Sequence, residues 1–158
     1  MSIESVRAHL ARHAPDLHVI ETPVSTATVA EAAAAHGVAP GQIAKTLSLR
    51  LGDEVVLLVL GGDARLDNRK FKARFACKPR MLDAAEVEAL TGHPVGGVCP
   101  FGLARDPRVF ADVTLRKFDV VLPAAGATNA ALRVAPERLA AIVGAEWVDV
   151  AQRPGEAG

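Results

Sequence analysis

The chain has 158 residues, half of them apolar, and a mass of 16.5 kDa. A chain of this length and composition can bury a core of its own, so we expect one domain that needs neither disulfides nor a structural metal. Its 18 basic and 18 acidic side chains give a formal net charge of zero, which excludes a strong overall attraction to nucleic acid or to an anionic membrane. Any polyanion must therefore bind a local patch.

Cysteine usage and the N-terminal residues indicate the cellular compartment. Cys77 and Cys99 are too few for a disulfide scaffold or a four-ligand zinc site, which suits a reducing environment. The N-terminus, MSIESVRAHLARHAPDL, lacks the apolar region of a signal peptide, and no apolar run is long enough to span a bilayer. His9 and His13 have no third partner at metal-ligand spacing. We expect a cytoplasmic protein without a metal or other cofactor.

The first half of the chain predicts short helices around an apolar hairpin. Thr28 with Glu31 has the form of a capping box, and Gly37 supplies the end of that helix. A Gly-Asp turn at 52–53 joins two apolar strands. The predicted elements are a helix from residue 3 to Pro15, a strand at 17–22, a helix between Thr28 and Gly37, and strands at 43–51 and 54–60.

The second half alternates helices and strands around one irregular loop. The predicted elements are helices at 67–75 and 83–92, a loop at 93–102, strands at 108–113 and 118–122, a turn at 124–130, a strand at 131–134, a helix at 136–144 and a last strand at 146–150. Hairpin-linked strands favour a mixed α/β fold, with a largely antiparallel mixed sheet and helices packed on it. We predict one domain over 1–151 and a disordered tail at 152–158.

The strand at 43–51, IAKTLSLRL, raises a question about one lysine. Period-2 alternation predicts that one face carries Ile43, Lys45, Leu47, Leu49 and Leu51. An unpaired ammonium is costly inside a core. Either Lys45 extends its ammonium to the sheet edge and packs only its stem, or this face opens onto a pocket where a fixed cation holds a phosphate or polarises an ester.

The loop GGVCPFG, at 96–102, is a second candidate. Its glycines allow the backbone to approach a ligand and to offer N–H groups to an oxyanion or a phosphate. A tight connection between helix and strand explains the same residues. The loop lacks the Gly-Lys-Ser/Thr of a P-loop, so we do not expect a nucleoside triphosphate.

Cys99, inside this loop, is a candidate nucleophile, and His93 is the histidine nearest to it in the sequence. The competing interpretation, a small buried side chain, is the commoner one for a free cysteine. Asp112, amid the apolar residues of VFADV, is expected to face solvent because of its place in the alternation.

Basic residues gather between positions 65 and 80. They are Arg65, Arg69, Lys70, Lys72, Arg74, Lys78 and Arg80. The cluster predicts either a solvated helix face or a surface that contacts phosphates and positions a nucleic acid without reading its sequence. The chain has no tyrosine and little other aromatic content, so we do not expect base stacking on an RNA-recognition sheet.

Taken together, these motifs follow a familiar order. Lys45-Thr46 opens a strand, GGV-x-PFG and VFAD follow, and AGATNAALRV leads into PERLAAIVGAEWVDV. Over residues 2–151 the chain resembles the YbaK/ProX family of aminoacyl-tRNA deacylases, relatives of the editing domain inserted in bacterial prolyl-tRNA synthetases. The resemblance implies a curved sheet and a pocket that hydrolyses the ester linking a wrong amino acid to a tRNA 3′ end, for example cysteine on tRNA(Pro) or another small amino acid.

The resemblance also implies roles for individual residues. Lys45 and Gly97 are predicted to be catalytic, the lysine by holding the substrate and backbone N–H groups of residues 97–102 by stabilising the tetrahedral oxyanion. Predicted substrate contacts are Thr46, Gly96, Val98, Cys99, Pro100, Gly102 and Asn129. The basic cluster supplies the predicted tRNA contacts, which are Arg65, Arg69, Lys70, Lys72 and Arg74; the tRNA is expected to bind through its 3′ end and acceptor stem. The expected partners are aminoacyl-tRNA and a synthetase, not DNA or a membrane.

Two other functions remain open from the sequence. A binding module with the same pocket would recruit tRNA or a synthetase without hydrolysis, and its tRNA binding would be salt-sensitive. A thiol-dependent hydrolase of a small ester or thioester would depend on Cys99 and would be sensitive to alkylation.

Overall fold

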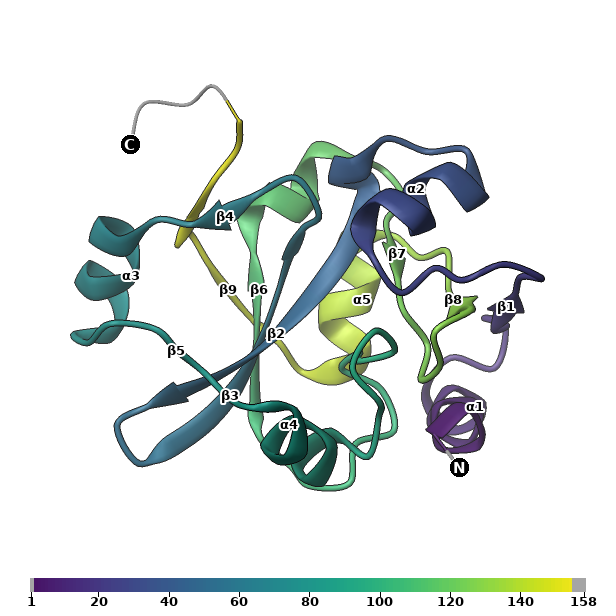
Figure 1. Ribbon diagram of the computed structural model, residues 1–158, viewed down its shortest axis with the longest axis horizontal. Coiled ribbons are helices and arrows are strands. Elements are labelled where there is room, and N and C mark those ends of the chain that lie inside the picture. The colour runs from purple at the N-terminus through teal and green to yellow at the C-terminus, as the bar shows by residue number, and fades with distance from the viewer. Residues whose placement is uncertain (1, 155–158) are drawn as a thin grey trace.

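The computed structural model describes residues 2–154 and consists of a mixed sheet with helices on both faces (Figure 1). The helices are α1 (Ser2–His13), α2 (Val29–His36), α3 (Asn68–Phe75), α4 (Ala84–Thr91) and α5 (Pro136–Val143), with 3-10 turns η1 (Pro40–Gln42) and η2 (Val113–Lys117). The strands are β1 (Ile20–Glu21), β2 (Ile43–Leu51), β3 (Glu54–Gly61), β4 (Arg65–Leu66), β5 (Arg80–Met81), β6 (Arg108–Asp112), β7 (Leu122–Pro123), β8 (Ala130–Ala131), β9 (Glu146–Val148) and β10 (Ala151–Gln152).

The main sheet has the strand order β5-β2-β3-β6-β9, and β7 also pairs with β2. The long β2–β3 hairpin and the β2–β5 pair are antiparallel, whereas β2–β7, β3–β6 and β6–β9 are parallel. Two small antiparallel sheets, β1–β8 and β4–β10, lie beside it. The predicted mixed α/β fold is therefore confirmed, although the pairings within the main sheet itself are more often parallel than the hairpin signals suggested.

Alternate residues of β3 face two different cores. Leu57 and Val59 belong to the larger core, which includes α1, α5 and the loop around Phe101. Leu58 and Leu60 face a smaller core that is closed by Phe71 of α3. Figure 1 shows α3 on the left of the sheet and α5 on its right. Because the sheet is covered on both faces, β3 reads as a continuous apolar run rather than an alternating one.

Local signals located the helices well. The capping boxes at Thr28 with Glu31 and at Asp83 with Glu86 are both formed, and Asp67 caps α3 by accepting a hydrogen bond from the Lys70 N–H. Gly144, after α5, has a left-handed backbone, the usual arrangement at a helix C-terminus. These contacts involve residues close in sequence, which explains why the sequence predicted where these helices begin and end.

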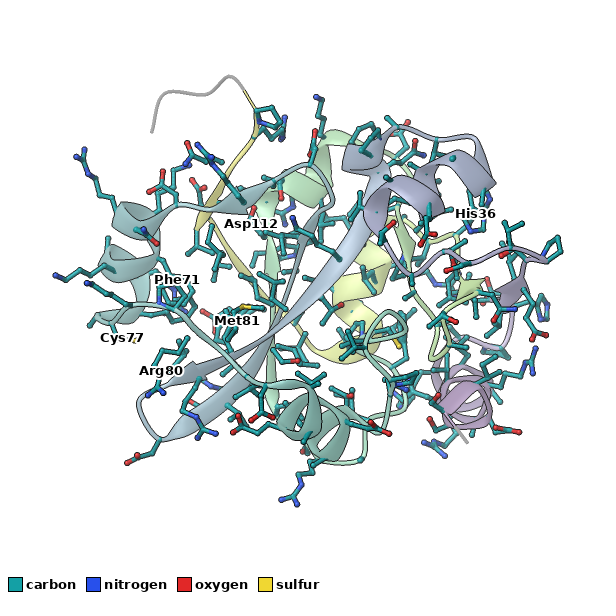
Figure 2. All side chains as sticks on the ribbon, in the orientation of Figure 1. His36, Phe71, Cys77, Arg80, Met81 and Asp112 are labelled. Carbon is teal, nitrogen blue, oxygen red and sulfur yellow. The ribbon has the colours of Figure 1, made fainter. Side chains whose placement is uncertain are left out.

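Three expectations need correction. Gln152, predicted to begin a disordered tail, lies in β10 and pairs with Arg65; residues 155–158 of that predicted tail lie outside the described part of the chain. The strand expected at 118–122 is limited to Leu122–Pro123. Asp112, expected to face solvent, is fully buried, and its carboxylate accepts hydrogen bonds from the N–H groups of Thr114 and Val150 (Figure 2). It therefore fixes η2 and the segment after β9.

Candidate active site

A cavity of about 400 Å³ lies beside β2, between α2, α4, the loop after His93, and strands β5, β7 and β8. Most of its wall is alanine, valine and other apolar side chains, and no aspartate or glutamate among residues 2–154 lines it. Its polar lining residues are Thr26, Thr28, His36, Lys45, Thr46 and Ser48. An apolar pocket with a few converging polar groups is typical of a small-molecule site.

The cavity lies at a break in the pairing of β2. On its outer edge, β2 pairs with β7 at Ile43 and Ala44 and with β5 at Leu49 and Arg50. Neither strand pairs with the residues between them. The Ser48 carbonyl points to this edge, since it accepts a hydrogen bond from the Leu82 N–H. Alternate residues of a strand direct their backbone groups to the same edge, so Thr46 offers its N–H and C=O to the cavity.

Lys45 is part of the cavity wall, but its ammonium is held by protein. Its Nζ donates hydrogen bonds to the carbonyls of Gly62, at 3.3 Å, and of Ala64. Burial lowers the pKa of Lys45, and the Asp63 carboxylate opposes that shift. Lys45 therefore lines a pocket, but its ammonium is anchored in the turn that follows β3 and does not extend to the sheet edge.

Three polar side-chain atoms of the lining have no hydrogen-bond partner within residues 2–154. They are Thr46 Oγ1, Ser48 Oγ and His36 Nε2. Burial, and to a smaller extent the Arg133 charge, lowers the pKa of His36. Buried polar groups in native proteins are nearly always hydrogen-bonded, so unpartnered ones in a cavity indicate where a ligand or water binds.

Exposed apolar side chains lie among the lining residues. Met81 is 61% exposed and Val95 is 62% exposed, and both line the cavity. Figure 2 shows Met81 on β5 and His36 on α2 at opposite sides of β2. Large exposed apolar groups beside a pocket are suited to contact a flat apolar ligand surface such as a nucleobase.

The glycine loop is divided between the cavity and the core. Gly96 and Val98 line the cavity, whereas Gly97 does not. The Gly97 N–H donates to the Pro94 carbonyl at 2.9 Å, and a Cβ at Gly97 would come within 2.6 Å of the Ala127 nitrogen. That N–H is therefore engaged and not available as the predicted oxyanion donor. Close packing against the turn at 126–129 accounts for the glycine.

The rest of the loop packs against α1 and the larger core. Pro100 is buried and, with Gly102, borders a separate hollow near His9. A Cβ at Gly102 would lie 2.4 Å from the Ser5 carbonyl oxygen. Asn129 also lies outside the cavity wall, and its Nδ2 donates to the Thr22 carbonyl at 3.0 Å. The structure thus brings Lys45, Thr46, Gly96 and Val98 together and separates Gly97, Cys99, Pro100, Gly102 and Asn129 from them.

Cys99 is fully buried in the larger core, and burial raises its pKa to about 12. Its Sγ lies 3.5 Å from His93 Nε2, which in turn is 2.7 Å from the Phe101 carbonyl. Because a carbonyl can only accept, Nε2 carries the proton and cannot take one from the thiol. The thiol is therefore protonated and enclosed, which does not fit a nucleophile.

The predicted tRNA-contact residues lie on α3 and β4, away from the cavity wall. Arg65, Arg69 and Lys72 are exposed. Lys70 pairs with Asp149 at 3.2 Å and Arg74 with Glu146, so part of the charge is neutralised by the segment around β9. Arg80 on β5 lies next to Met81 (Figure 2), and this strand connects the basic surface to the cavity.

Comparison with known proteins identifies the family of this chain. A family model described as "Aminoacyl-tRNA editing domain" matches residues 23–142. The chain belongs to this family. Another member, the uncharacterized protein YwhH of Bacillus subtilis, is 46% identical over 95% of this editing-domain chain and 97% of its own length. EbsC of Enterococcus faecalis, named provisionally as a Cys-tRNA(Pro)/Cys-tRNA(Cys) deacylase, is 27% identical over 82% of the chain and 79% of its own length.

Solved structures agree with the editing-domain family. A candidate trans-editing enzyme for prolyl-tRNA synthetase superposes with a TM-score of 0.88 at 33% identity and covers 96% of this chain and 97% of its own. The hypothetical protein APE2540 gives a TM-score of 0.85, also at 33% identity, over 94% and 99%. The proline–tRNA ligase of Bacillus licheniformis is 31% identical over 64% of this chain, which corresponds to 18% of the ligase. In the described residues of this editing domain, no helix is long and apolar enough to cross a membrane.

Sequence reasoning missed Ser48 and His36 as lining residues of the editing domain. The alternation of β2 assigned Ser48 to the face opposite Lys45, and only one of the two faces was expected to line the pocket. A cavity at a strand edge admits side chains from both faces. The signal for Ser48 was its polarity in an apolar strand, whereas nothing in the sequence indicated that His36, at the end of α2, reaches the same cavity.

Proposed function

We propose that this editing domain is a free-standing deacylase, which hydrolyses the ester that joins a small amino acid to the 3′ end of a mischarged tRNA. The observation that carries the proposal is the cavity at the unpaired edge of β2, with Lys45 in its wall. Such a site can hold an aminoacyl ester between apolar walls and polarise it. The cytoplasm, where charged tRNA is used, is the proposed location.

Lys45 is the proposed substrate-holding cation. Its position, anchored on the Gly62 and Ala64 carbonyls, keeps the ammonium fixed beside the cavity, where it can attract a phosphate of the tRNA end or the ester oxygen. A fixed charge in a partly desolvated site is worth more than the same charge in water.

The Thr46 N–H is the proposed donor to the oxyanion, in place of the engaged Gly97 N–H. It faces the cavity on the unpaired edge, and Gly96 lines the same space. The reaction is attack of water on the ester carbonyl: a bond forms between the water oxygen and the carbonyl carbon, the bond between that carbon and the ribose oxygen breaks, and the proton from water passes to the departing ribose oxygen, which becomes a hydroxyl. Loss of one oxyanion donor typically costs about a hundredfold in rate.

The basic residues of α3 and β4 are the proposed contacts of the tRNA body. Arg65, Arg69 and Lys72 are exposed to solvent and carry no ion pair within the described residues. Apolar Met81 is proposed to contact the terminal adenosine.

The test is a panel of tRNAs charged in turn with Cys, Ala, Ser, Thr and Pro, each incubated with wild type and with Lys45→Ala. We expect wild type to empty one or two of them, and Lys45→Ala to be about a hundredfold slower or worse because the fixed cation is gone. Lys117→Ala, an exposed lysine on η2, is the matched control and should behave as wild type.

Two outcomes count against the proposal. A folded Lys45→Ala protein with normal activity would remove Lys45 from the mechanism. Salt-sensitive tRNA binding with no deacylation of any charged tRNA would favour the binding-module function instead.

A further inference from the structure

The hydroxyl groups that line the cavity fall into two pairs. Thr26 Oγ1 donates to the Thr128 carbonyl at 3.3 Å, and Thr28 Oγ1 accepts from the Glu31 N–H at 3.1 Å. Thr46 Oγ1 and Ser48 Oγ have no partner within residues 2–154. The first pair maintains the fold around α2, and the second pair is left for a ligand.

Ser48 is the most deeply placed of these groups. It is 3% exposed and stands two residues from Thr46, so both hydroxyls leave β2 on the same face. The side chains that α4 and the loop contribute to the cavity wall, Ala84, Val87 and Val98, are apolar and cannot supply a hydrogen bond. A buried hydroxyl without a hydrogen bond is destabilising, so its presence calls for a bound group that supplies the bond.

The charges of the lining determine which part of an aminoacyl ester reaches Ser48. No carboxylate among the described residues lines the cavity, so a buried α-ammonium would have no counter-ion, which is costly. The ammonium and the ester, which stays attached to the tRNA, therefore remain outside the apolar part of the cavity. The amino-acid side chain is the neutral part, so it is the part that can enter among the apolar lining residues and reach Ser48.

We propose that Ser48, with Thr46 beside it, recognises a side-chain hydroxyl, so that the cargo of this site is a β-hydroxy amino acid, serine or threonine. The inference rests on the proposed deacylase function and specifies its substrate class. A hydroxyl can both donate to and accept from these oxygens, whereas an alanyl methyl group leaves both unpaired and a thiol bonds only weakly. Sites built to bond a substrate hydroxyl reject the analogue that lacks it.

The kinetic test compares kcat/KM for one tRNA charged with Ser, Thr, Ala or Cys. The enzymes are wild type, Ser48→Ala, Thr46→Val and the control Ser5→Ala, whose hydroxyl bonds to the Ser2 carbonyl within α1. We expect wild type to prefer Ser over Ala by about tenfold or more. Ser48→Ala should lose that preference by slowing only the Ser and Thr reactions, and Ser5→Ala should keep it.

Two kinetic results would overturn the inference. In one, wild type releases alanine or cysteine at least as fast as serine. In the other, Ser48→Ala slows all four cargos equally, which would mean that the hydroxyl contacts the ammonium or the ribose common to all of them. We expect Ser48→Ala to fold with an unchanged or higher melting temperature, because the change removes an unpaired buried hydroxyl.

A binding test separates this inference from the proposed function. The probes are seryl and alanyl 3′-amino-3′-deoxyadenosine, in which an amide replaces the ester, and their Kd values are measured by calorimetry. Tighter binding of the seryl amide to wild type, with the difference abolished in Ser48→Ala or Thr46→Val, supports the hydroxyl site even if no charged tRNA is hydrolysed. Equal binding of the two amides to wild type overturns it even if deacylation is observed.

Discussion

Lys45 and Thr46 are neighbours in β2 whose side chains leave the strand on opposite faces, and both line the cavity. They can do so because the strand has no partner at this point of its outer edge. At the scale of single residues, the cavity therefore lies where a strand pairing is missing, and Thr46 and Ser48 contribute buried, unpartnered hydroxyls to its wall.

Cys99 gives a prediction at the same scale. Because burial raises its pKa to about 12, the thiol is protonated at every pH at which the enzyme would be assayed. We expect Cys99→Ala to keep deacylation within about threefold of wild type, while losing some stability from the small cavity that it leaves. Deacylation assays and urea unfolding measure the two effects.

Alkylation provides the control for that prediction. Cys77 is partly exposed, so iodoacetamide should modify Cys77 in the native protein and leave Cys99 unmodified until the chain is unfolded. A folded Cys99→Ala protein without activity would restore the thiol nucleophile.

The loop between α4 and β6 works as a packing element. Its glycines approach two other backbone segments, the turn at 126–129 through Gly97 and α1 through Gly102. Only Gly96 and Val98 of the predicted loop contacts line the cavity. A loop that packs closely against the core and a loop that stabilises an oxyanion can both be rich in glycine. Composition alone therefore did not distinguish the packing role from the catalytic role.

Gly102 and Gly52 form a matched pair for testing this packing. Both have a left-handed backbone, with φ of 58° and 60°, so alanine strains both by about 1–2 kcal/mol. A Cβ at Gly52 meets nothing within 4 Å, whereas one at Gly102 would lie 2.4 Å from the Ser5 oxygen. We expect Gly102→Ala to lose about 1–3 kcal/mol more in free energy of unfolding than Gly52→Ala, since overpacking adds to the strain. If urea unfolding shows equal losses of free energy for the two variants, α1 moves aside to accommodate the added Cβ at Gly102.

The sequence predicted the parts of the fold that depend on neighbouring residues. The starts of the helices at Thr28, Asp67 and Asp83 and the β2–β3 hairpin were all predicted. The short strands β4, β5 and β10 were not predicted, because two residues carry no period and pair only through distant partners. Asp112 was misassigned for a related reason, since one of the N–H groups that it binds belongs to Val150, far along the chain.

Across the whole molecule, the basic and acidic side chains are equal in number but unevenly distributed over the surface. The chain has no net charge, yet Arg65, Arg69 and Lys72 form an exposed basic surface on β4 and α3. A neutral protein with one such surface can orient tRNA without binding anionic surfaces indiscriminately.

This surface predicts a salt dependence. We expect the double variant Arg69→Ala/Lys72→Ala to bind tRNA more weakly and to lower the slope of log Kd against log salt by about 1 for each phosphate that the protein no longer neutralises. Its preference among amino acids should not change, because neither residue lines the cavity. Arg138→Ala on α5, an arginine paired with Asp16, is the control. An unchanged slope would place the tRNA on another surface.

Alanine and valine supply 11 of the 23 residues of the cavity wall, and threonine and serine are among its polar residues. Codons for valine, threonine and serine each differ from a codon for alanine by a single base. At the wall positions that carry one of these four residue types, a point mutation can thus add or remove a methyl or hydroxyl group, and the backbone around it need not move. The shape and polarity of this cavity therefore lie within reach of single nucleotide substitutions that preserve the fold.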